Sequence, residues 1–432
     1  MTPVKQAGGV RPSGSDTTAP TVGGDTTPYD IVIAGAGAVG LALACALADA
    51  LEAVRIAVVD PGAFAETPAA RDARASALSA SSRRLLEGVG AWAALAPHAE
   101  AVTAVDITDS SLEDAFRPVL VSYDNTVEGG EPATFIVENE RLNAAILAAA
   151  AGRPGIDHLE GAAAGYRAGP HAMTLELADS RTLSAPLLVA ADGRNSRLRR
   201  AAGIGVVGWE YDQVGIVATV AHAKPHRSRA LQNFFPAGPF AILPLMGNRS
   251  CITWTEEAAR GRAIAALDDA GFLAEVEKRF GYRLGSIALA GPRGVWPLEM
   301  HLARALTADR LVLVGDAAHL VHPIAGQGLN LGLRDVAALT EVVADAARLG
   351  LDIGSAIVLE RYARWRRTDA AMSAAAFDAL NRLFSNDLTL LRTARSAGLR
   401  LVDRMPALKQ FFVTEAAGLT GELPKLLRGE RV

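Results

Sequence analysis

The sequence predicts an α/β protein in which a Rossmann-like dinucleotide-binding domain carries an inserted, mostly antiparallel β-sheet domain and a helical C-terminal region. Three observations lead to this prediction. A G-x-G-x-x-G segment joins a buried-strand pattern to a helical pattern close to the start of the chain. Two later strand patterns end in an aspartate beside a glycine, at Asp192 and Asp316. Between these two aspartates, stretches of β-type composition are broken by Pro and Gly, as in antiparallel sheets.

Length and composition narrow the class of protein. The 432 residues allow two or three packed units, because a single core stops growing at about 250–300 residues. A net charge of −4 gives no sign of a nucleic-acid surface, and two cysteines provide no disulfide framework. Residues 1–28 are mostly Gly, Pro, Ser and Thr and predict a flexible tail. No apolar run of about 20 residues is present. We expect a cytoplasmic protein, with peripheral contact to the inner face of the membrane left open.

The glycine-rich segment GAGAVG follows the strand pattern YDIVIA and precedes a helical pattern. Gly35 allows a tight turn, Gly37 lets the backbone approach a pyrophosphate, and Gly40 lets the helix and strand pack closely. A second strand pattern ends at Asp60, 20 residues after Gly40, where a ribose-binding carboxylate belongs. The alternative is an accidental Gly-rich turn. The motif predicts dinucleotide binding but does not separate FAD from NAD.

Polar residues at three further junctions are candidates for the same site. The segment RDARASALSASSRRLL resembles a loop entering a helix, where Arg74 could reach a pyrophosphate or remain solvated. In TFIVENERLNAAIL a strand turns into a helix at Asn139, which could also be a helix cap. After the strand LLVAA, Asp192, Ser196 and Arg199 cluster, although each alone could be a cap or a surface residue. Ligands collect at the carboxyl ends of strands in such sheets.

The stretch LVLVGDAAHLVHPIAGQGLNLGLRD is the most informative of the chain. A short buried strand stops at Gly315 and Asp316, where a carboxylate can accept hydrogen bonds from ligand hydroxyls. A helical pattern follows from Asn330, and the backbone N–H groups at its start favour anionic groups. Neither His319 nor His322 is assigned a catalytic role, because a loop histidine is as often a scaffold residue. The strand ends at Gly35, Asp192 and Gly315 are expected to converge.

Two regions of the chain each allow two interpretations: the β-type stretches in the middle and the helical residues 360–432. The stretches YDQVGIVATVA and LQNFFPAGPFAILPLMGNRSCITWT predict an inserted sheet with an apolar face. That face either packs in a core or lines a substrate pocket with Phe235, Phe240 and Leu243. Residues 360–432 are helical in pattern and hold 13 Lys and Arg against 8 Asp and Glu, a net of +5. They form a helical lid or a basic amphipathic surface for an anionic membrane.

Together, GAGAVG, ADGRNSRLR and GDAAHLVHPIAGQGLNLGLRD resemble the flavin-dependent aromatic hydroxylases related to p-hydroxybenzoate hydroxylase. Within that group, HPIAGQGLNLGLRD, WEYDQVGIVATV and FFPAGPFAILPL are similar to the ubiquinone-biosynthesis hydroxylases. The resemblance extends from Tyr29 to the C-terminus. Gln327 and His322 depart from p-hydroxybenzoate hydroxylase, which has Lys and Pro there. No match to its substrate-activating tyrosines is found, which favours a more apolar phenol.

The resemblance implies FAD as the cofactor and assigns a role to each matched residue. The three motif glycines would cradle the pyrophosphate, Asp60 would hold the adenosine ribose and Asp316 would bind the ribityl chain. Pro323 would lie near the reactive flavin edge as the catalytic position. Asp192 would face the groove shared by FAD and the reductant. The remaining cofactor contacts implied are Arg74, Asn139, Gly326, Gly328, Leu329 and Asn330. No metal ligand is implied.

The resemblance also implies a division of the chain. Its parts are a disordered tail at 1–28, a discontinuous FAD-binding domain at 29–105, 132–204 and 295–345, a substrate-binding β domain at 106–131 and 205–294, and C-terminal helices at 346–432.

The activity implied is hydroxylation of the aromatic ring of a polyprenylated phenol in ubiquinone biosynthesis, through a flavin C4a-hydroperoxide formed with O₂. Electrons would come from NAD(P)H or a ferredoxin-type partner. Other ubiquinone-biosynthesis proteins are expected partners, and nucleic acid is not. Two alternatives stay open. One is a flavin reductase or dehydrogenase acting on another apolar substrate, and the other is a non-catalytic scaffold that retains FAD for stability.

Overall fold

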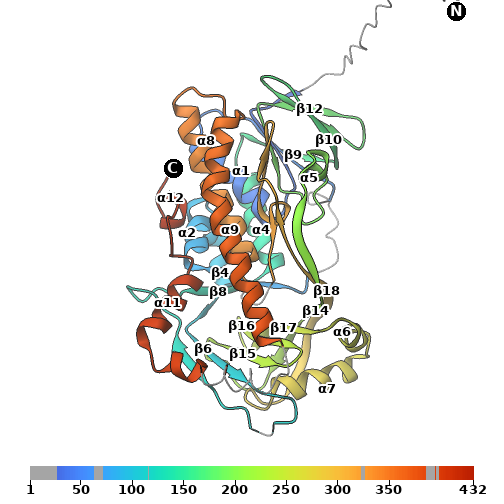
Figure 1. Ribbon diagram of the computed structural model, residues 1–432, viewed down its shortest axis with the longest axis vertical. Coiled ribbons are helices and arrows are strands. Elements are labelled where there is room, and N and C mark those ends of the chain that lie inside the picture. Colours follow the sequence, from blue (N-terminus) through green and yellow to red (C-terminus); the bar gives the residue numbers. More distant parts are fainter. Residues whose placement is uncertain (1–26, 63–71, 115, 323–325, 386–394, 396–397) are drawn as a thin grey trace, which may run out of the picture.

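The computed structural model describes residues 27–62, 72–114, 116–322, 326–385, 395 and 398–432. The expected flexible tail lies outside these ranges except for two residues, which form the short strand β1 (Thr27–Pro28). The molecule is elongated, with a helix-covered parallel sheet at one end and a curved, mostly antiparallel sheet at the other (Figure 1). The predicted combination of an α/β unit with an inserted β sheet is therefore confirmed.

A six-stranded sheet with the order β19-β20-β13-β2-β3-β9 forms the first unit. All neighbouring strands are parallel except β19 and β20. The central strands are buried along their whole length, which explains their continuous apolar runs in the sequence. The strand bounds are β2 Ile31–Ala34, β3 Ile56–Asp60, β9 Ile156–Glu160, β13 Leu187–Ala190, β19 Thr307–Ala308 and β20 Leu311–Leu313.

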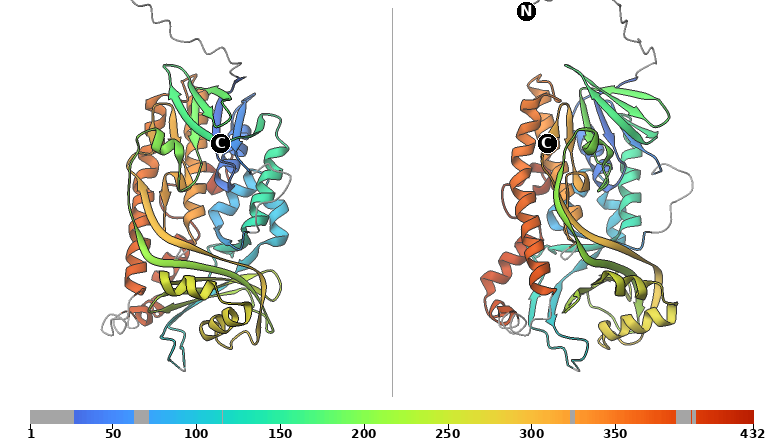
Figure 2. Two further views of the ribbon diagram at one scale, coloured as in Figure 1. Left: turned by 90° about the vertical axis from the view of Figure 1, so that its right-hand side faces the viewer. Right: turned by 45° about the vertical axis from the view of Figure 1, so that its right-hand side comes forward.

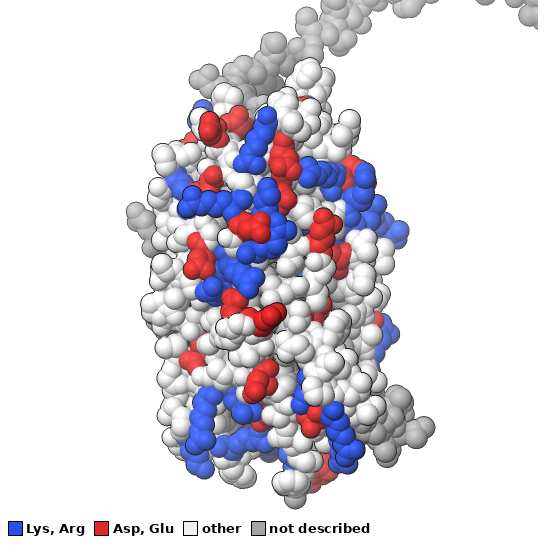
Figure 3. All heavy atoms as spheres, turned by 90° about the vertical axis from the view of Figure 1, so that its left-hand side faces the viewer, with Lys and Arg blue, Asp and Glu red and all other residues white. Residues whose placement is uncertain are grey.

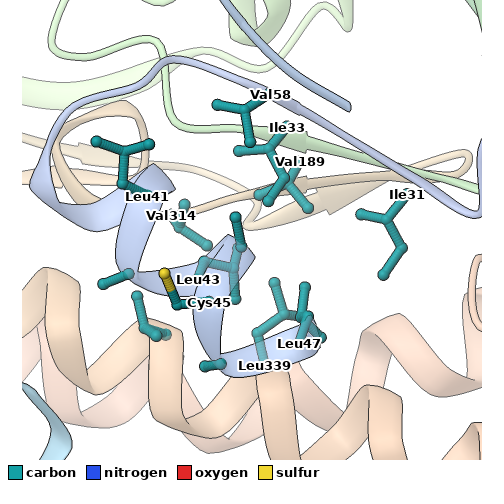
Figure 4. Packing of buried hydrophobic residues seen from close by; sticks show 14 of the residues in the cluster. Ile31, Ile33, Leu41, Leu43, Cys45, Leu47, Val58, Val189, Val314 and Leu339 are labelled. Carbon is teal, nitrogen blue, oxygen red and sulfur yellow. The ribbon is translucent and has the colours of Figure 1, made fainter. Parts of the chain in front are cut away.

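Helix α1 (Ala38–Ala50) packs between this sheet and α8 (Gly328–Arg348), as Figure 4 shows. Cys45 lies fully buried in this layer, as expected of a small apolar residue in an Ala-rich helix. Helix α4 (Asn139–Ala151) also contacts α1. The short helices nearby are α2 Ala80–Gly88, α3 Trp92–Leu95, η1 Ala96–His98 and α5 Arg197–Ala201.

The second unit is an eight-stranded sheet with the order β21-β18-β14-β17-β16-β15-β6-β7. It is antiparallel except where β15 pairs with β6. Helices α6 (Ala258–Ala265) and α7 (Asp269–Phe280) cover one face, and Phe240, Trp254 and Phe272 pack into that core. The strand bounds are β6 Ala104–Asp109, β7 Val121–Asp124, β14 Val206–His222, β15 Arg229–Phe235, β16 Gly238–Leu245, β17 Arg249–Glu257, β18 Ile287–Ala303 and β21 His319–Leu320.

Strands β14 and β18 are 17 residues long each and pair antiparallel. Figure 2 shows them running side by side from the end that holds the parallel sheet to the end that holds α6 and α7. Strand β18 crosses the domain boundary expected at residue 295. One continuous ribbon therefore belongs to both units.

Two small sheets complete the β structure. One has the order β4-β8-β5, and the other β1-β12-β11-β10. The segment expected to be a loop entering a helix is a strand, β4, that leads directly into α2. The bounds are β4 Ala75–Ser79, β5 Glu100–Val102, β8 Thr134–Glu138, β10 Ala163–Ala168, β11 Met173–Leu177 and β12 Thr182–Ala185.

The C-terminal region is helical, as predicted. Helix α9 (Ala356–Phe384) runs along most of the long axis and contacts both α8 and the ribbon strand β18 (Figure 1). Helices α11 (Pro406–Ala416) and α12 (Lys425–Arg428) follow. None of the helices in the described ranges has the length and apolar character needed to cross a membrane.

Candidate functional site

The three predicted strand-end turns converge. Strands β2, β13 and β20 are parallel neighbours, so the turns that follow them lie at one edge of the sheet. Gly35 has φ +111°, and a Cβ there would lie 2.2 Å from the carbonyl oxygen of Ala191. Gly315 has φ +58°, and a Cβ there would contact Val39 at the start of α1. A Cβ is therefore sterically excluded at Gly35, and the positive φ favours glycine at both positions.

The other two motif glycines differ in what surrounds them. A Cβ at Gly40 would lie 2.0 Å from the carbonyl oxygen of Gly35, so this glycine is required for packing. Gly37 is the N-cap of α1, with an ordinary φ of −70°, and a Cβ there would have no neighbour within 4 Å in the described chain. No side chain caps this helix start. The described side chains therefore leave the first N–H groups of α1 without a cap, and such a helix start favours an anionic group.

Asp60 connects the second strand to the glycine turn. Its Oδ2 accepts a hydrogen bond from Ala36 N at 2.9 Å, and its Oδ1 accepts one from Gly62 N at 2.9 Å. The carboxylate therefore lies beside the glycine turn, where the ribose of a dinucleotide is expected.

The turn after β13 is held by Asp192 and Ser196 together. Asp192 Oδ2 accepts hydrogen bonds from Arg197 N and Leu198 N, and Ser196 caps α5 by accepting from Arg199 N at 2.9 Å. Within the described chain, the shielded Oδ1 of Asp192 has no hydrogen-bond partner. Arg199 is buried rather than on the surface, because its guanidinium donates to the Ala317 carbonyl at 2.9 Å. This contact joins two of the three turns.

A cavity of about 630 Å³, called the polar cavity below, opens beside these turns. Five of the residues predicted to bind the cofactor line it, and they come from four separate segments. They are Arg74, Asn139, Asp316, Gly326 and Gly328. The sequence placed them in one site although up to about 250 residues separate them, and the fold brings them together.

Asp72 holds two of these residues, Arg74 and Asn139, in place. It was not predicted from the sequence. Arg74 Nη2 lies 2.8 Å from Asp72 Oδ2, and Asn139 Nδ2 donates to the same oxygen at 3.3 Å. Burial opposes ionisation of Asp72, but the hydrogen bonds from Arg74 outweigh it and lower the pKa of the carboxyl. The Arg74 guanidinium lies 5.3 Å from the ring centroid of Trp296, which also lines the polar cavity. No motif reveals Asp72, because its role depends on the pairing of β4 with β8.

The Asp316 side chain is exposed to the polar cavity. The surrounding protein keeps most bulk water away, and this desolvation raises the pKa of the carboxyl, while His319, His301 and Arg74 act in the opposite direction. A ligand hydroxyl that donates to Asp316 would replace the missing water.

A buried ionic network behind the turn holds Gly315 in place. Asp335 accepts hydrogen bonds from Gly315 N at 2.8 Å, from His319 Nε2 at 2.7 Å and from Arg366 Nε at 2.6 Å. Burial opposes the ionisation of Asp335, but His319 and Arg366 outweigh it and lower its pKa. His319 is thus a buried scaffold residue. The sequence analysis missed Asp335 and Arg366, because only the packing of α8 on α9 brings them together.

The start of α8 reaches the polar cavity. Gly328 is its first residue, no side chain of the described residues caps it, and no acidic residue occupies its first turn. The carboxamide of Asn330 binds protein groups: Oδ1 accepts from Ser79 N at 2.9 Å, and Nδ2 donates to Ala77 O at 2.8 Å. Leu329 packs against the main core. Pro323 lies outside the described residues.

A second cavity of about 740 Å³, called the apolar cavity below, adjoins the first. Three residues, Val105, Thr134 and Gln232, line both cavities. Most of its other lining side chains are apolar and come from β6, β7, β15, α9 and the C-terminal helices. Examples are Ile107, Val121, Phe234, Phe377, Leu380, Leu383, Phe384, Leu399, Val402 and Phe412.

The three residues predicted to line a substrate pocket lie in two different places. Leu243 lines the polar cavity, whereas Phe235 and Phe240 are buried in the core between the large sheet and helices α6 and α7. Side chains alternate between the two faces of a strand. On β15 this alternation sends Phe234 to the apolar cavity and Phe235 to the opposite face. Phe235 and Phe240 are therefore core residues, and the residues that line the cavities are Phe234 and Leu243.

Comparisons with known proteins agree with this geometry. The FAD binding domain family matches residues 28–374. The chain is 40% identical over 419 residues to ubiquinone hydroxylase UbiL of Rhodospirillum rubrum, a match that covers 95% of each chain. It is 34% identical over 401 residues to 3-demethoxyubiquinol 3-hydroxylase of Escherichia coli, covering 91% of this chain and 99% of the relative. The crystal structure of p-nitrophenol 4-monooxygenase PnpA from Pseudomonas putida shares the fold, with a TM-score of 0.76, 18% identity and coverage of 92% and 100%.

Proposed function

Because this chain belongs to the FAD-binding hydroxylases of ubiquinone biosynthesis, we propose that it hydroxylates the aromatic ring of a polyprenylated phenol with O₂. The observation that carries this proposal is the pair of adjoining cavities. One is lined by polar side chains such as Arg74, Asn139 and Asp316, and most of the side chains that line the other are apolar. A substrate with an oxygenated ring and a long hydrocarbon tail has the same division.

The residues fit FAD. The open N-terminus of α1 at Gly37 would take the pyrophosphate, and Asp60 would take the adenosine ribose. Asp316, facing the polar cavity, would accept hydrogen bonds from the ribityl chain. Bound there, FAD supplies the reaction with O₂ from which the transferred oxygen comes.

The protein contributes binding, electrostatics and exclusion of water. The uncapped start of α8 at Gly328 carries partial positive charge and would stabilise negative charge on a ring in the polar cavity. Apolar side chains such as Val217 and Leu243 line the opposite wall and keep water from the reacting groups.

The apolar cavity would hold the tail. Each buried CH₂ group contributes about 0.8 kcal/mol of transfer free energy, so one isoprene unit contributes up to about 4 kcal/mol. In this proposal the tail provides most of the affinity. The electron donor is NAD(P)H or a ferredoxin-type protein, and direct oxidation of NAD(P)H by the purified flavoprotein distinguishes between them.

A surface with exposed apolar and basic side chains lies next to the apolar cavity. Several large apolar side chains of the C-terminal helical region are exposed, and basic residues lie between them. The apolar group comprises Leu401, Met405, Phe411 and Phe412, and the basic group Arg400, Arg404 and Lys409. Figure 3 shows basic side chains gathered at the lower end of the face that carries α11 in Figure 1. We propose that this surface rests on an anionic bilayer, from which the lipid substrate enters.

Vesicle binding tests the membrane proposal. Replacing both Leu401 and Phe411 by Ser removes about 2 kcal/mol or more of apolar burial, and we expect at least a tenfold weaker binding to phosphatidylglycerol vesicles in co-sedimentation. Phe116→Ser is the matched control, because Phe116 is 79% exposed but lies outside the C-terminal helices. Equal binding of the double variant and the wild type would contradict the proposal.

Mass spectrometry of a strain that lacks this protein tests the function. We expect a prenylated intermediate that lacks one or more ring oxygens to accumulate. An intermediate that differs instead in the saturation of its tail would favour a prenyl-chain reductase. Complementation with a folded variant that binds no FAD tests the scaffold alternative, since only a scaffold would restore ubiquinone.

A further inference from the structure

Strand β15 forms the boundary between the two cavities. Ala230, Gln232 and Phe234 alternate onto the same face of the sheet. Ala230 lines the polar cavity, Phe234 lines the apolar cavity, and Gln232 lies between them and lines both. The side chain of Gln232 is therefore placed where a ligand that fills both cavities must pass from one to the other.

The neighbouring strands show the same boundary. Gln232 pairs with Ile107 of β6 on one side and with Ala241 of β16 on the other. Ile107 lines the apolar cavity, while Ala241 and its own partner Thr253 line the polar cavity. Across this row of the sheet, the lining changes from apolar to polar at Gln232.

The carboxamide of Gln232 has no protein partner in the described chain. Its nitrogen is shielded from solvent and makes no hydrogen bond. The next residue, Asn233, points to the other face and accepts a hydrogen bond from Thr108 Oγ1 at 2.8 Å. Gln232 is half-buried and lines both cavities, so its carboxamide is free to hydrogen-bond a ligand that fills them.

We propose that Gln232 hydrogen-bonds the ring oxygen next to the carbon that bears the prenyl tail. This inference rests on the proposed function, because it requires a substrate with its ring in the polar cavity and its tail in the apolar cavity. The ring carbon that carries the tail then lies at the boundary, and the adjacent ring oxygen is the polar group nearest to Gln232. A carboxamide offers both a donor and an acceptor to a hydroxyl when its terminal group rotates.

This contact makes Gln232 a positioning residue. A ring held only by its tail can turn about the bond that joins ring and tail. A hydrogen bond to one oxygen beside that bond selects one orientation of the ring. The orientation determines which ring carbon faces the flavin site, so Gln232 determines the position of hydroxylation.

A matched pair of ligands tests the contact with the FAD-loaded protein. The probes are 2-geranylphenol and geranylbenzene, which differ only in the ring oxygen. Their dissociation constants follow from quenching of tryptophan fluorescence, because Trp296 lines the polar cavity. We expect the wild type to prefer the phenol by about tenfold, the contribution of one hydrogen bond. Gln232→Met, which keeps the length but not the amide, should reduce this preference to about one by weakening phenol binding alone.

Two further variants provide the controls. Gln410→Met makes the same exchange on the exposed side of α11 and should keep the wild-type preference. Gln232→Leu is the second variant if Gln232→Met lowers the FAD content. A preference for the phenol that persists in both Gln232 variants would overturn the inference.

Turnover of 2-geranylphenol gives a readout that a purely structural role would not change. We expect the wild type to yield one hydroxylated isomer, and Gln232→Met to yield a mixture. A single unchanged isomer from the variant would contradict the positioning role. If the wild type forms no hydroxylated product although the phenol preference depends on Gln232, the proposed function fails and the hydrogen bond stands.

Discussion

At the scale of single residues, two glycines of one motif have different physical roles. Gly40 is needed by the fold, because a Cβ there would lie 2.0 Å from a backbone oxygen. Gly37 is not needed by the fold, because a Cβ there meets no described atom within 4 Å and its φ suits any residue. Substitutions at Gly37 and Gly40 can therefore separate an effect on cofactor binding from an effect on stability.

Gly37→Ala should leave the free energy of unfolding of the apoprotein within about 0.5 kcal/mol of the wild type, because the methyl group points into open space. The same methyl group should obstruct the pyrophosphate and weaken FAD binding by about tenfold or more, about 1.4 kcal/mol. Urea unfolding and FAD titration measure the two quantities. Gly40→Ala is the control and should destabilise the apoprotein itself. Unchanged FAD affinity in Gly37→Ala would show that the pyrophosphate does not bind there.

His322 should make stability depend on pH. Burial lowers its pKa from 6.5 to about 4, although Asp378 acts in the opposite direction. Below pH 6.5 the unfolded chain therefore binds a proton that the folded chain rejects. The stability that neutral His322 contributes is complete above pH 6.5 and is lost as the pH falls towards 4.

His322→Phe retains a ring against Tyr211, whose centroid lies 5.1 Å from that of the histidine. Between pH 7 and pH 5, the wild type should lose about 2 kcal/mol more unfolding free energy than this variant. Urea titrations at both pH values make the comparison. Parallel losses in the two proteins would indicate that His322 is protonated in the folded state.

The position of a residue could be predicted where a motif fixes the backbone. It could not be predicted where it depends on which face of a strand the residue occupies. The glycines and Asp316 follow from strand–turn–helix patterns, and the structure brings them together. Phe235 was predicted for the pocket, but its neighbour Phe234 faces the cavity. A shift of one residue along a strand reverses its faces, and the sequence of this irregular stretch does not reveal the phase.

At the scale of elements, Asp335 joins the turn after β20 to two helices. It lies in α8, accepts from Gly315 N, and pairs with Arg366 of α9, 31 residues away. The position of Asp316 in the site thus depends on the packing of α9. Arg366 lines neither cavity, but through Asp335 it helps to hold Asp316 in the site.

Asp335→Asn should destabilise the protein by about 3 kcal/mol, because it leaves the buried Arg366 short of a counter-charge. Asp345→Asn is the matched control on the same helix. Its partner Arg361 is more than half exposed, so the control should cost about 0.5 kcal/mol or less. Urea unfolding of both apoproteins compares them. Similar small losses would mean that the network adds little to stability.

Elements with continuous apolar runs were predictable, because both faces of the parallel sheet are buried. Strand β4 was not predictable, because its sequence ASALS is short and only half buried. It forms a strand because it pairs with β8. The full length of β14 and β18 was also missed. The first half of each strand is largely exposed, and the antiparallel pairing sets it against the more buried second half of the other strand.

At the scale of the whole molecule, the two cavities lie between two units that several segments of the chain connect. The ribbon of β14 and β18 and the long helix α9 run from one unit to the other (Figures 1 and 2). The parallel sheet supplies the cofactor turns, the large sheet supplies the floor of both cavities, and the C-terminal helices close the apolar one. The sequence predicted an α/β unit with an inserted β sheet and offered an apolar pocket as one interpretation. It did not predict that two cavities meet at Gln232, which only the tertiary packing creates.

In the proposed reaction, this chain transfers an oxygen atom from O₂ to a prenylated ring by means of bound FAD. Turnover of 2-geranylphenol by the purified flavoprotein under ¹⁸O₂, followed by mass spectrometry of the product, measures this most directly. We predict a product that contains one ¹⁸O atom per hydroxyl group added. A product without the label, or a protein that consumes O₂ and never alters the ring, would contradict the claim.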